Sequence, residues 1–166
     1  MIGATRARSA ESLYEILPRL QLMKPNEGRL QTAEHILSRI IERKVSDARV
    51  VIAKFKEESG LLEMTTETDL REELDLNEIQ DRVCEIMRKE LPVHKSTKKR
   101  EEAEKEVDLS NIPSFVQDVR IVEIEDFDKR PCRDPHVNNT KEIGNFKILS
   151  LKRVGNNRYR FTFQVE

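Results

Sequence analysis

The stretch that decides the fold lies at the carboxyl end of the chain, where residues 158–165 read Arg-Tyr-Arg-Phe-Thr-Phe-Gln-Val. Aromatic and aliphatic residues alternate here with polar ones, and a period of two is typical of a β-strand with one buried face. Residues 146–154 have a similar strand-like composition and precede it across Gly155-Asn156. The two segments therefore predict an antiparallel hairpin at the end of the chain.

Apolar residues at helical spacing occur earlier in the chain. After the turn-forming residues 25–28, apolar side chains recur every three or four positions and predict a helix with one buried face, carried by Ala33, Ile36, Leu37, Ile40 and Ile41. A second helix is expected over residues 76–90, with Asp75 as its N-cap and Pro92 beyond its end. A third apolar stripe, over residues 9–22, is interrupted by Pro18 and predicts a kinked or shortened helix.

The remaining segments predict further strands and one charged helix. A first hairpin is expected around Ser59-Gly60, and two more segments have strand-like composition, so that the expected strands cover residues 49–56, 61–66, 93–96 and 119–124. Residues 98–107 are almost wholly charged, with both signs at helical spacing, which favours a solvated helix.

The order of these elements predicts an α+β fold. We expect a mostly antiparallel sheet with helices packed on one face, forming a single domain over residues 1–166. Residues 1–26 are expected to form an N-terminal helical extension of this domain. A chain of this length buries enough surface to fold without disulfide bonds.

The composition narrows the class of protein. Charged and hydrophobic residues each make up 37% of the chain, the net charge is −1, and no apolar run approaches the roughly 18 residues of a membrane helix. We therefore expect no membrane association, and a cytoplasmic location.

Of the two cysteines, Cys84 falls in an apolar helical pattern and is expected in the core, which leaves Cys132 as a candidate ligand. No phosphate-binding loop, Ser-His-Asp spacing or dinucleotide fingerprint is evident.

Four side chains form two candidate metal-binding pairs. Gln31 and His35 are one helical turn apart, so their side chains share a face of the expected helix. Cys132 and His136 have the same spacing in a segment that contains two prolines and reads as a loop. Zinc prefers thiolate and imidazole ligands, and a site with three protein ligands keeps its fourth position open for catalysis. From the residues alone, two interpretations of this segment stay open, a metal site and an ordinary loop.

With their neighbours, these residues resemble the signature of alanyl-tRNA editing proteins and of the editing domains of alanyl- and threonyl-tRNA synthetases. That family has His-x-x-x-His, often His-Thr-Ala-x-His, at the start of a helix, and far downstream Cys-x-x-x-His followed by Thr-x-Glu-Ile-Gly. Here the motifs read Gln31-Thr32-Ala33-Glu34-His35 and Cys132 to His136, followed by Thr140, Glu142, Ile143 and Gly144. The likeness covers most of residues 27–165, and the chain is similar to the free-standing short form that edits in trans. It implies the fold of the second additional domain of these synthetases.

Two departures from the family pattern affect the implied metal site. Gln31 replaces the first family histidine, and an amide oxygen is a poor zinc ligand beside imidazole. The resemblance therefore implies that His35, Cys132 and His136 hold Zn²⁺, with Gln31 as a weak ligand at most. Arg133-Asp134 stand where the family often has two glycines, and Asp134 is either an oxygen ligand, a hydrogen-bond partner of a ligand, or the start of an Asp-Pro turn.

Further residues are candidates for catalysis and for tRNA binding. Thr32 is a candidate contact for a substrate hydroxyl, with helix packing as the alternative, and Glu142 is a candidate for orienting a ligand or a water, with a solvated loop carboxylate as the alternative. Glu34 points off the face of His35 and is expected to be a surface charge. Phosphates of tRNA are usually met by lysine and arginine, and the outward face of the final hairpin offers Arg158, Arg160 and Lys152.

The resemblance implies a trans-acting hydrolase that clears mischarged aminoacyl-tRNA, with Ser-tRNA(Ala) or Gly-tRNA(Ala) as the expected substrates and a zinc site. Two alternatives remain open. Because Gln31 and Arg133-Asp134 depart from the pattern, the chain is alternatively a catalytically decayed module that binds tRNA or a synthetase. A structural metal domain with an unrelated partner, closed by Asp134 as a fourth ligand, is the third interpretation.

Overall fold

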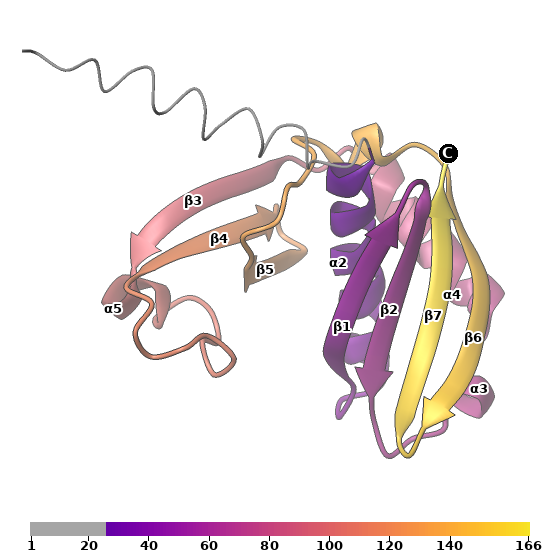
Figure 1. Cartoon of the computed structure of the whole chain (residues 1–166). Helices are drawn as coiled ribbons and strands as arrows, with labels where there is room; N and C mark the ends of the chain where they lie inside the picture. Colours follow the sequence, from indigo (N-terminus) through magenta and orange to yellow (C-terminus); the bar gives the residue numbers. More distant parts are fainter. Residues whose placement is uncertain (1–25) are drawn as a thin grey trace, which may run out of the picture.

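The structure is a computed structural model that describes residues 26–166. The helix expected over residues 9–22, and with it all but the last residue of the expected N-terminal extension, lies outside the described residues. Within them the chain forms two antiparallel sheets and two main helices, which confirms the expected α+β class (Figure 1).

The larger sheet has four strands and contains both predicted hairpins. Its order is β1-β2-β7-β6, with bounds Arg49–Lys56 for β1, Ser59–Thr65 for β2, Phe146–Gly155 for β6 and Arg158–Val165 for β7. The turns lie one or two residues from their expected places, since Glu57 and Asn157 have the positive φ angles of 56° and 52°. Strand β1 forms one edge of this sheet.

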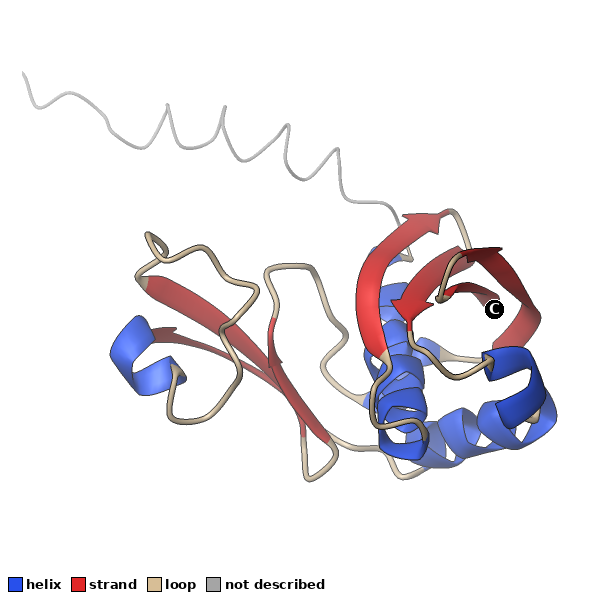
Figure 2. Cartoon of the chain, turned by 90° about the horizontal axis from the view of Figure 1, so that it is seen from below, coloured by secondary structure: helices blue, strands red, loops and turns tan. Residues whose placement is uncertain are grey.

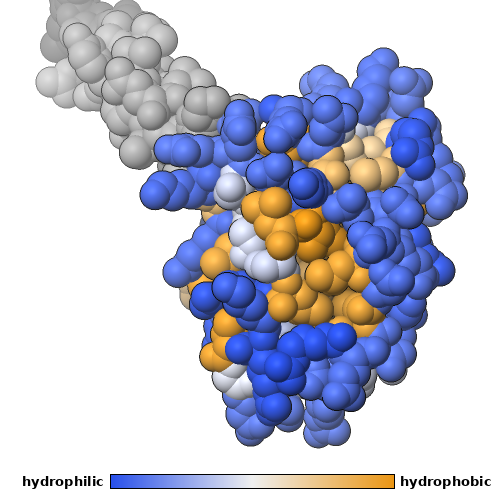
Figure 3. Space-filling view, turned by 90° about the vertical axis from the view of Figure 1, so that its right-hand side faces the viewer, coloured by the Kyte–Doolittle hydropathy of each residue, from blue (hydrophilic) through white to orange (hydrophobic). Residues whose placement is uncertain are grey.

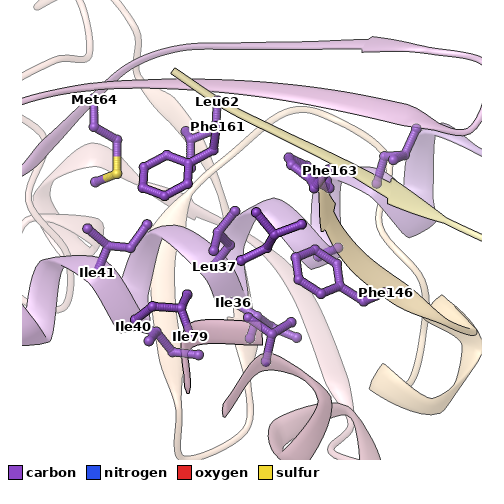
Figure 4. Close-up of a cluster of buried hydrophobic side chains, with 14 of the residues drawn as sticks. Ile36, Leu37, Ile40, Ile41, Leu62, Met64, Ile79, Phe146, Phe161 and Phe163 are labelled. Atoms are coloured by element: carbon purple, nitrogen blue, oxygen red, sulfur yellow. The ribbon is translucent and has the colours of Figure 1, made fainter. Parts of the chain in front are cut away.

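Both main helices cover the same face of this sheet (Figure 2). They are α2, Glu27–Lys44, and α4, Leu76–Arg88, which is preceded by the short α3, Leu70–Glu73. Asp75 caps α4 as predicted, because its side chain accepts hydrogen bonds from the backbone N–H groups of Asn77 and Glu78. Between helices and sheet lies a hydrophobic core, part of which is drawn in Figure 4: Ile36, Leu37, Ile41, Ile79, Leu62, Met64, Phe146, Phe161 and Phe163.

A second, three-stranded sheet lies beside α2 and was not expected as a separate layer. Its order is β3-β4-β5, with bounds Val93–Lys99 for β3, Asp118–Ile124 for β4 and Asp128–Pro131 for β5. The helix predicted over residues 98–107 is wrong in extent, because Lys98 and Lys99 pair with β4 and only α5, Arg100–Ala103, is helical. A small cluster of its own, formed by Ala103, Leu109, Val119 and Ile121, stabilises this sheet.

The Thr-x-Glu-Ile-Gly stretch anchors the loop after β5 to the core. It forms a 3₁₀ turn, η1, Thr140–Ile143, in which the Thr140 hydroxyl accepts from the Leu91 N–H at 2.9 Å and donates to the Met87 carbonyl at 3.2 Å. Ile143 is fully buried. Gly144 follows with φ of 85°, and a Cβ there would lie 2.4 Å from the backbone oxygen of Glu166. The motif therefore has a structural role at nearly every position.

The surface is mostly hydrophilic, with a few apolar areas. Seen from the side that carries β6 and α4 in Figure 1, hydrophobic side chains are exposed in the middle of a hydrophilic rim (Figure 3). The exposed large apolar residues among those described are Val51, Phe115, Leu149 and Val154. No helix within residues 26–166 has the length and apolar character needed to span a bilayer.

Gly144→Ala is expected to destabilise the fold, whereas Gly155→Ala is not. At Gly144 a side chain meets both a positive φ and a backbone atom, and such strain costs about 1–3 kcal/mol. At Gly155 the nearest atom to a Cβ is 3.7 Å away, an ordinary contact. Urea unfolding of both variants measures the difference, and equal midpoints would contradict this account of the turn.

Candidate metal centre

Three predicted ligand residues converge at one point beside α2. His35 projects from the middle of α2, whereas Cys132 and His136 come from the loop that follows β5. One ligand atom from each of these three residues lies within 4.8 Å of the other two. His35 and His136 are 3% and 9% exposed, and their rings meet edge to face at 4.4 Å. Two imidazoles and a thiol at this separation are a donor set that suits a transition metal such as zinc.

Thr32 orients the ring of His136. Its hydroxyl donates to the backbone oxygen of Gly28 at 2.9 Å, so the same oxygen is left as an acceptor toward His136 Nδ1 at 3.1 Å and the Val137 N–H at 3.2 Å. Nδ1 of His136 therefore carries the ring proton, and the unprotonated Nε2 lies 3.4 Å from Cys132 Sγ. This arrangement presents a nitrogen lone pair to a metal ion.

Asp128 supports His35 from the opposite side. Its carboxylate, at 4% exposure, lies 3.5 Å from Nδ1 of His35. Arg39 donates to Oδ1 at 2.7 Å, and Arg130 donates to Oδ2 at 2.9 Å and to Oδ1 at 3.0 Å. A carboxylate behind an imidazole is the usual partner of a metal-binding histidine, because it fixes the ring and strengthens the nitrogen that faces the metal.

The electrostatics of the two histidines differ. Burial lowers the pKa of His35, but the neighbouring Asp128 carboxylate and the Cys132 side chain outweigh burial and raise that pKa to about 9. Burial and the nearby positive charge of His35 hold the pKa of His136 far below its usual range. Burial raises the pKa of Asp128, but His35 and Arg130 together bring it well below its ordinary value. His35 is thus the more basic of the two imidazoles, because the Asp128 carboxylate lies beside it.

The side chains of Arg120 and Glu142 bind the backbone of the loop that follows β5 and carries Cys132 and His136, here called the ligand loop. Arg120 donates to the carbonyl oxygens of Cys132 and Asp134, at 3.1 and 2.7 Å. The Glu142 carboxylate accepts from the N–H groups of Asn138 and Asn139, at 2.8 and 2.7 Å. In the structure, Glu142 is therefore engaged in shaping the loop, and its catalytic role stays a prediction.

Gln31 and Asp134, which depart from the family pattern, lie at the edge of the group formed by His35, Cys132 and His136. Gln31 is 6% exposed, one turn before His35, and lines a cavity of about 600 Å³ between the start of α2 and the β1–β2 hairpin. Asp134 lines the same cavity, is exposed, and its Oδ2 lies 3.8 Å from Cys132 Sγ. The expectation that Glu34 is a surface charge is wrong, because its side chain is only 5% exposed.

The predicted tRNA-binding residues lie on the outward face of the larger sheet. Arg158 and Arg160 both donate to the carboxylate of Glu63, at 2.6 and 2.7 Å, and keep 40% and 42% of their side chains exposed. Lys152 is paired in register with Arg160 and is exposed. Part of the positive charge on this face is therefore balanced within the protein, and its contact with phosphates stays a prediction.

Sequence reasoning missed the residues that support the ligands. Asp128, Arg130, Arg39 and Arg120 have no spacing that links them to the metal pairs, because their contacts depend on how β4 and β5 pack against α2. Asp128 lies between Phe127 and Lys129 in the printed sequence, where an acidic residue has no distinctive pattern. Only the tertiary arrangement reveals these contacts.

Asp128→Asn is expected to lower the affinity of the protein for Zn²⁺ about 10- to 100-fold, because the amide loses the charge that orients His35. Competition with a chromogenic chelator measures this affinity. Asp126→Asn is a matched control, since Asp126 is exposed in the β4–β5 turn and has a φ of 56° that asparagine tolerates. Equal zinc affinity in both variants would rule out the proposed support of His35 by Asp128.

Comparison with known proteins finds a matching family model and similar alanine–tRNA ligases. Residues 119–162, which contain Cys132 and His136, match the family described as the Threonyl and Alanyl tRNA synthetase second additional domain. An alanine–tRNA ligase of Thermoanaerobacter sp. (strain X514) is 31% identical over 131 residues, or 78% of this chain and 15% of the ligase. The ligase of Methanopyrus kandleri is also 31% identical, over 139 residues, or 80% of this chain and 15% of the ligase.

A shorter relative is similar over a comparable share of the chain. The alanyl-tRNA editing protein AlaX-M of Methanosarcina barkeri is 27% identical over 142 residues, which cover 81% of this chain and 56% of that protein. The chain thus spans about 15% of the length of the two ligases and just over half of the editing protein. Over about four fifths of its length, this chain is therefore similar to one region of alanine–tRNA ligases and to an alanyl-tRNA editing protein.

Proposed function

We propose that this protein is a metal-dependent hydrolase that releases the amino acid from mischarged tRNA, acting in trans on Ser-tRNA(Ala) or Gly-tRNA(Ala). The observation that carries the proposal is the group of His35, Cys132 and His136, which lies beside a cavity of about 600 Å³. Similarity to alanine–tRNA ligases and to an alanyl-tRNA editing protein supports the substrate class. An editing role of this kind would operate in the cytoplasm.

In this proposal His35, Cys132 and His136 hold one Zn²⁺ ion. A zinc ion with three protein ligands supplies a Lewis acid with a free coordination position. The protein itself fixes the two imidazoles, through Asp128 behind His35 and Thr32 behind His136. The ester bond of aminoacyl-tRNA is already activated, so catalysis mainly requires a positioned water and stabilisation of the developing oxyanion.

The cavity is the proposed place for the aminoacyl end of the tRNA. Gln31, Asp134 and the edge strand β1 line it, so a ligand there lies beside the metal group. Thr32 of α2 and Glu142 of η1 are proposed to position His136 and the backbone around it. Arg158, Arg160 and Lys152 are proposed phosphate contacts for the body of the tRNA.

A catalytically decayed tRNA-binding module is the second candidate. The observation that favours it is Gln31, a buried amide at the position of a family histidine, which leaves the metal with one ligand fewer on α2. Such a protein would bind tRNA without releasing the amino acid. Deacylation and tRNA binding are therefore measured on the same preparation.

Cys132→Ala is expected to lose bound zinc and to reduce the deacylation of Ser-tRNA(Ala) by at least about 100-fold, because the thiolate is one of only three ligands. Cys84→Ala is the control, since this thiol lies on α4, where it packs against the core and contacts the Phe146 carbonyl at 3.8 Å, and is not part of the metal group. Zinc content by mass spectrometry and release of radiolabelled serine are the two measurements. Full turnover by Cys132→Ala would contradict the proposed function.

Gln31→His is expected to raise the zinc affinity at least about 10-fold, since it adds an imidazole one turn before His35. If the wild-type protein binds tRNA but does not deacylate it, this variant separates the two candidates. Recovery of deacylation by Gln31→His would identify a decayed enzyme. Deacylation by the wild-type protein, in contrast, excludes decay.

A further inference from the structure

The face of the larger sheet that points away from the helices is rich in positive charge. Side chains alternate between the two faces of a strand, and the core residues Leu62 and Phe161 show which face is buried. By this alternation and the strand register, the outward face carries Lys54, Lys56, Lys147, Lys152, Arg158 and Arg160. Glu63 is the only acidic residue in the four strands, and it already binds Arg158 and Arg160.

Two of these cations, Lys54 and Lys56, also line the cavity beside the metal group. Both are exposed on the edge strand β1, and within the described part of the chain neither side chain makes a hydrogen bond or an ion pair. The same cavity is lined by Thr162 of the outward face and by Gln31 of α2. It therefore extends from the outward face of the sheet, around the edge strand, to the metal group.

This course of the cavity fits the end of an aminoacylated RNA strand. In the proposed function the cavity holds the aminoacyl end, and the amino acid is esterified to the last nucleotide. The next charged groups along the strand are then the phosphodiesters of the unpaired 3′ nucleotides. Lys54 and Lys56 are two residues apart in β1, so their side chains point the same way and leave the strand about 7 Å apart. Two flexible lysines at this separation can contact consecutive phosphates.

We propose that Lys54 and Lys56 bind the phosphodiesters that precede the 3′-terminal nucleotide of the tRNA. The inference rests on the proposed function and deepens it, because it names the route by which the acceptor end enters the site. The end passes from the outward face of the sheet over β1 and into the cavity. Lysine meets a phosphate as a point charge, so this contact positions the strand without reading its sequence.

The acidic residues of the cavity agree with this route. Glu27 of α2 and the exposed Asp134 of the ligand loop line it as well. Their carboxylates disfavour a phosphate on the wall formed by these two segments, since like charges repel. The phosphates are thereby confined to the side of the cavity that carries Lys54 and Lys56.

Equilibrium binding of two stable conjugates to the zinc-loaded protein tests this proposal. Both carry serine in amide linkage to 3′-amino-3′-deoxyadenosine. One is this nucleoside alone, and the other is a trinucleotide in which two cytidines precede it, joined by two phosphodiesters. Because the nucleoside conjugate has no phosphate, the double variant Lys54→Gln/Lys56→Gln is expected to bind it as the wild-type protein does.

The same double variant is expected to bind the trinucleotide conjugate more weakly and with less dependence on salt. Each phosphate contact on a single strand contributes about 0.7 to the slope of log K against log salt, so the slope is expected to fall by about 1.4 in magnitude. Between about 50 and about 200 mM salt, this difference corresponds to about a sevenfold change in relative affinity.

The double variant Lys89→Gln/Lys105→Gln is the matched control. It removes the same amount of charge, and both lysines are exposed and lie outside the larger sheet. This variant is expected to keep the wild-type affinity and salt slope for the trinucleotide conjugate. Urea unfolding of both double variants is expected to give the wild-type midpoint, because substitution of exposed side chains changes stability little.

Three results would overturn the assignment. A wild-type salt slope in Lys54→Gln/Lys56→Gln would show that neither lysine contacts a phosphate. An equal loss of binding for both conjugates would indicate a disturbed cavity instead. Equal effects of the two double variants would indicate a general effect of net charge.

The outcomes for the lysines and for the proposed function are distinguishable. Phosphate-dependent binding without release of serine from Ser-tRNA(Ala) would support the contacts of Lys54 and Lys56 and refute only the reaction. Release of serine by the wild-type protein, together with an unchanged salt slope in Lys54→Gln/Lys56→Gln, would refute only the contacts.

Discussion

The site depends on one buried charge, the carboxylate of Asp128. It links α2 to β5, because Arg39 and His35 of the helix and Arg130 of the strand all face it. Breaking a buried ion pair by removing one partner is strongly destabilising, so the two elements are held in one relative position. That position brings the loop after β5 over α2, where Thr32 orients His136. Without the Asp128 contacts, the ligand residues would belong to two independent layers.

The fold was predictable where the chain has a strong local period. The alternation Tyr159, Phe161, Phe163, Val165 and the apolar stripe of α2 correctly indicated a sheet with one face covered by helices. The second sheet was less predictable. Strand β5 is only four residues long, and the charged residues at the end of β3 resemble a solvated helix until their pairing with β4 is known. Local composition does not contain that pairing.

The candidate site was predictable in its ligands and not in their surroundings. The spacing of Cys132 and His136, and the place of His35 on a helix, are visible in the sequence because metal ligands need particular residue types. Asp128 and Glu34 are ordinary acidic residues in a chain with 31 of them, and only burial distinguishes them. Glu34 was misjudged because the helical wheel places it off the face of His35, while the adjoining layers cover that side of α2 as well.

The central claim is that two separate segments of the chain supply the ligands of one metal ion. X-ray absorption at the zinc edge of the purified protein tests it most directly. We expect one sulfur at about 2.3 Å from the zinc and imidazole nitrogens at about 2.0–2.1 Å. A light atom in the fourth coordination position is expected to add to the nitrogen shell. A spectrum without sulfur, or a protein that retains no zinc after purification in its presence, would contradict it.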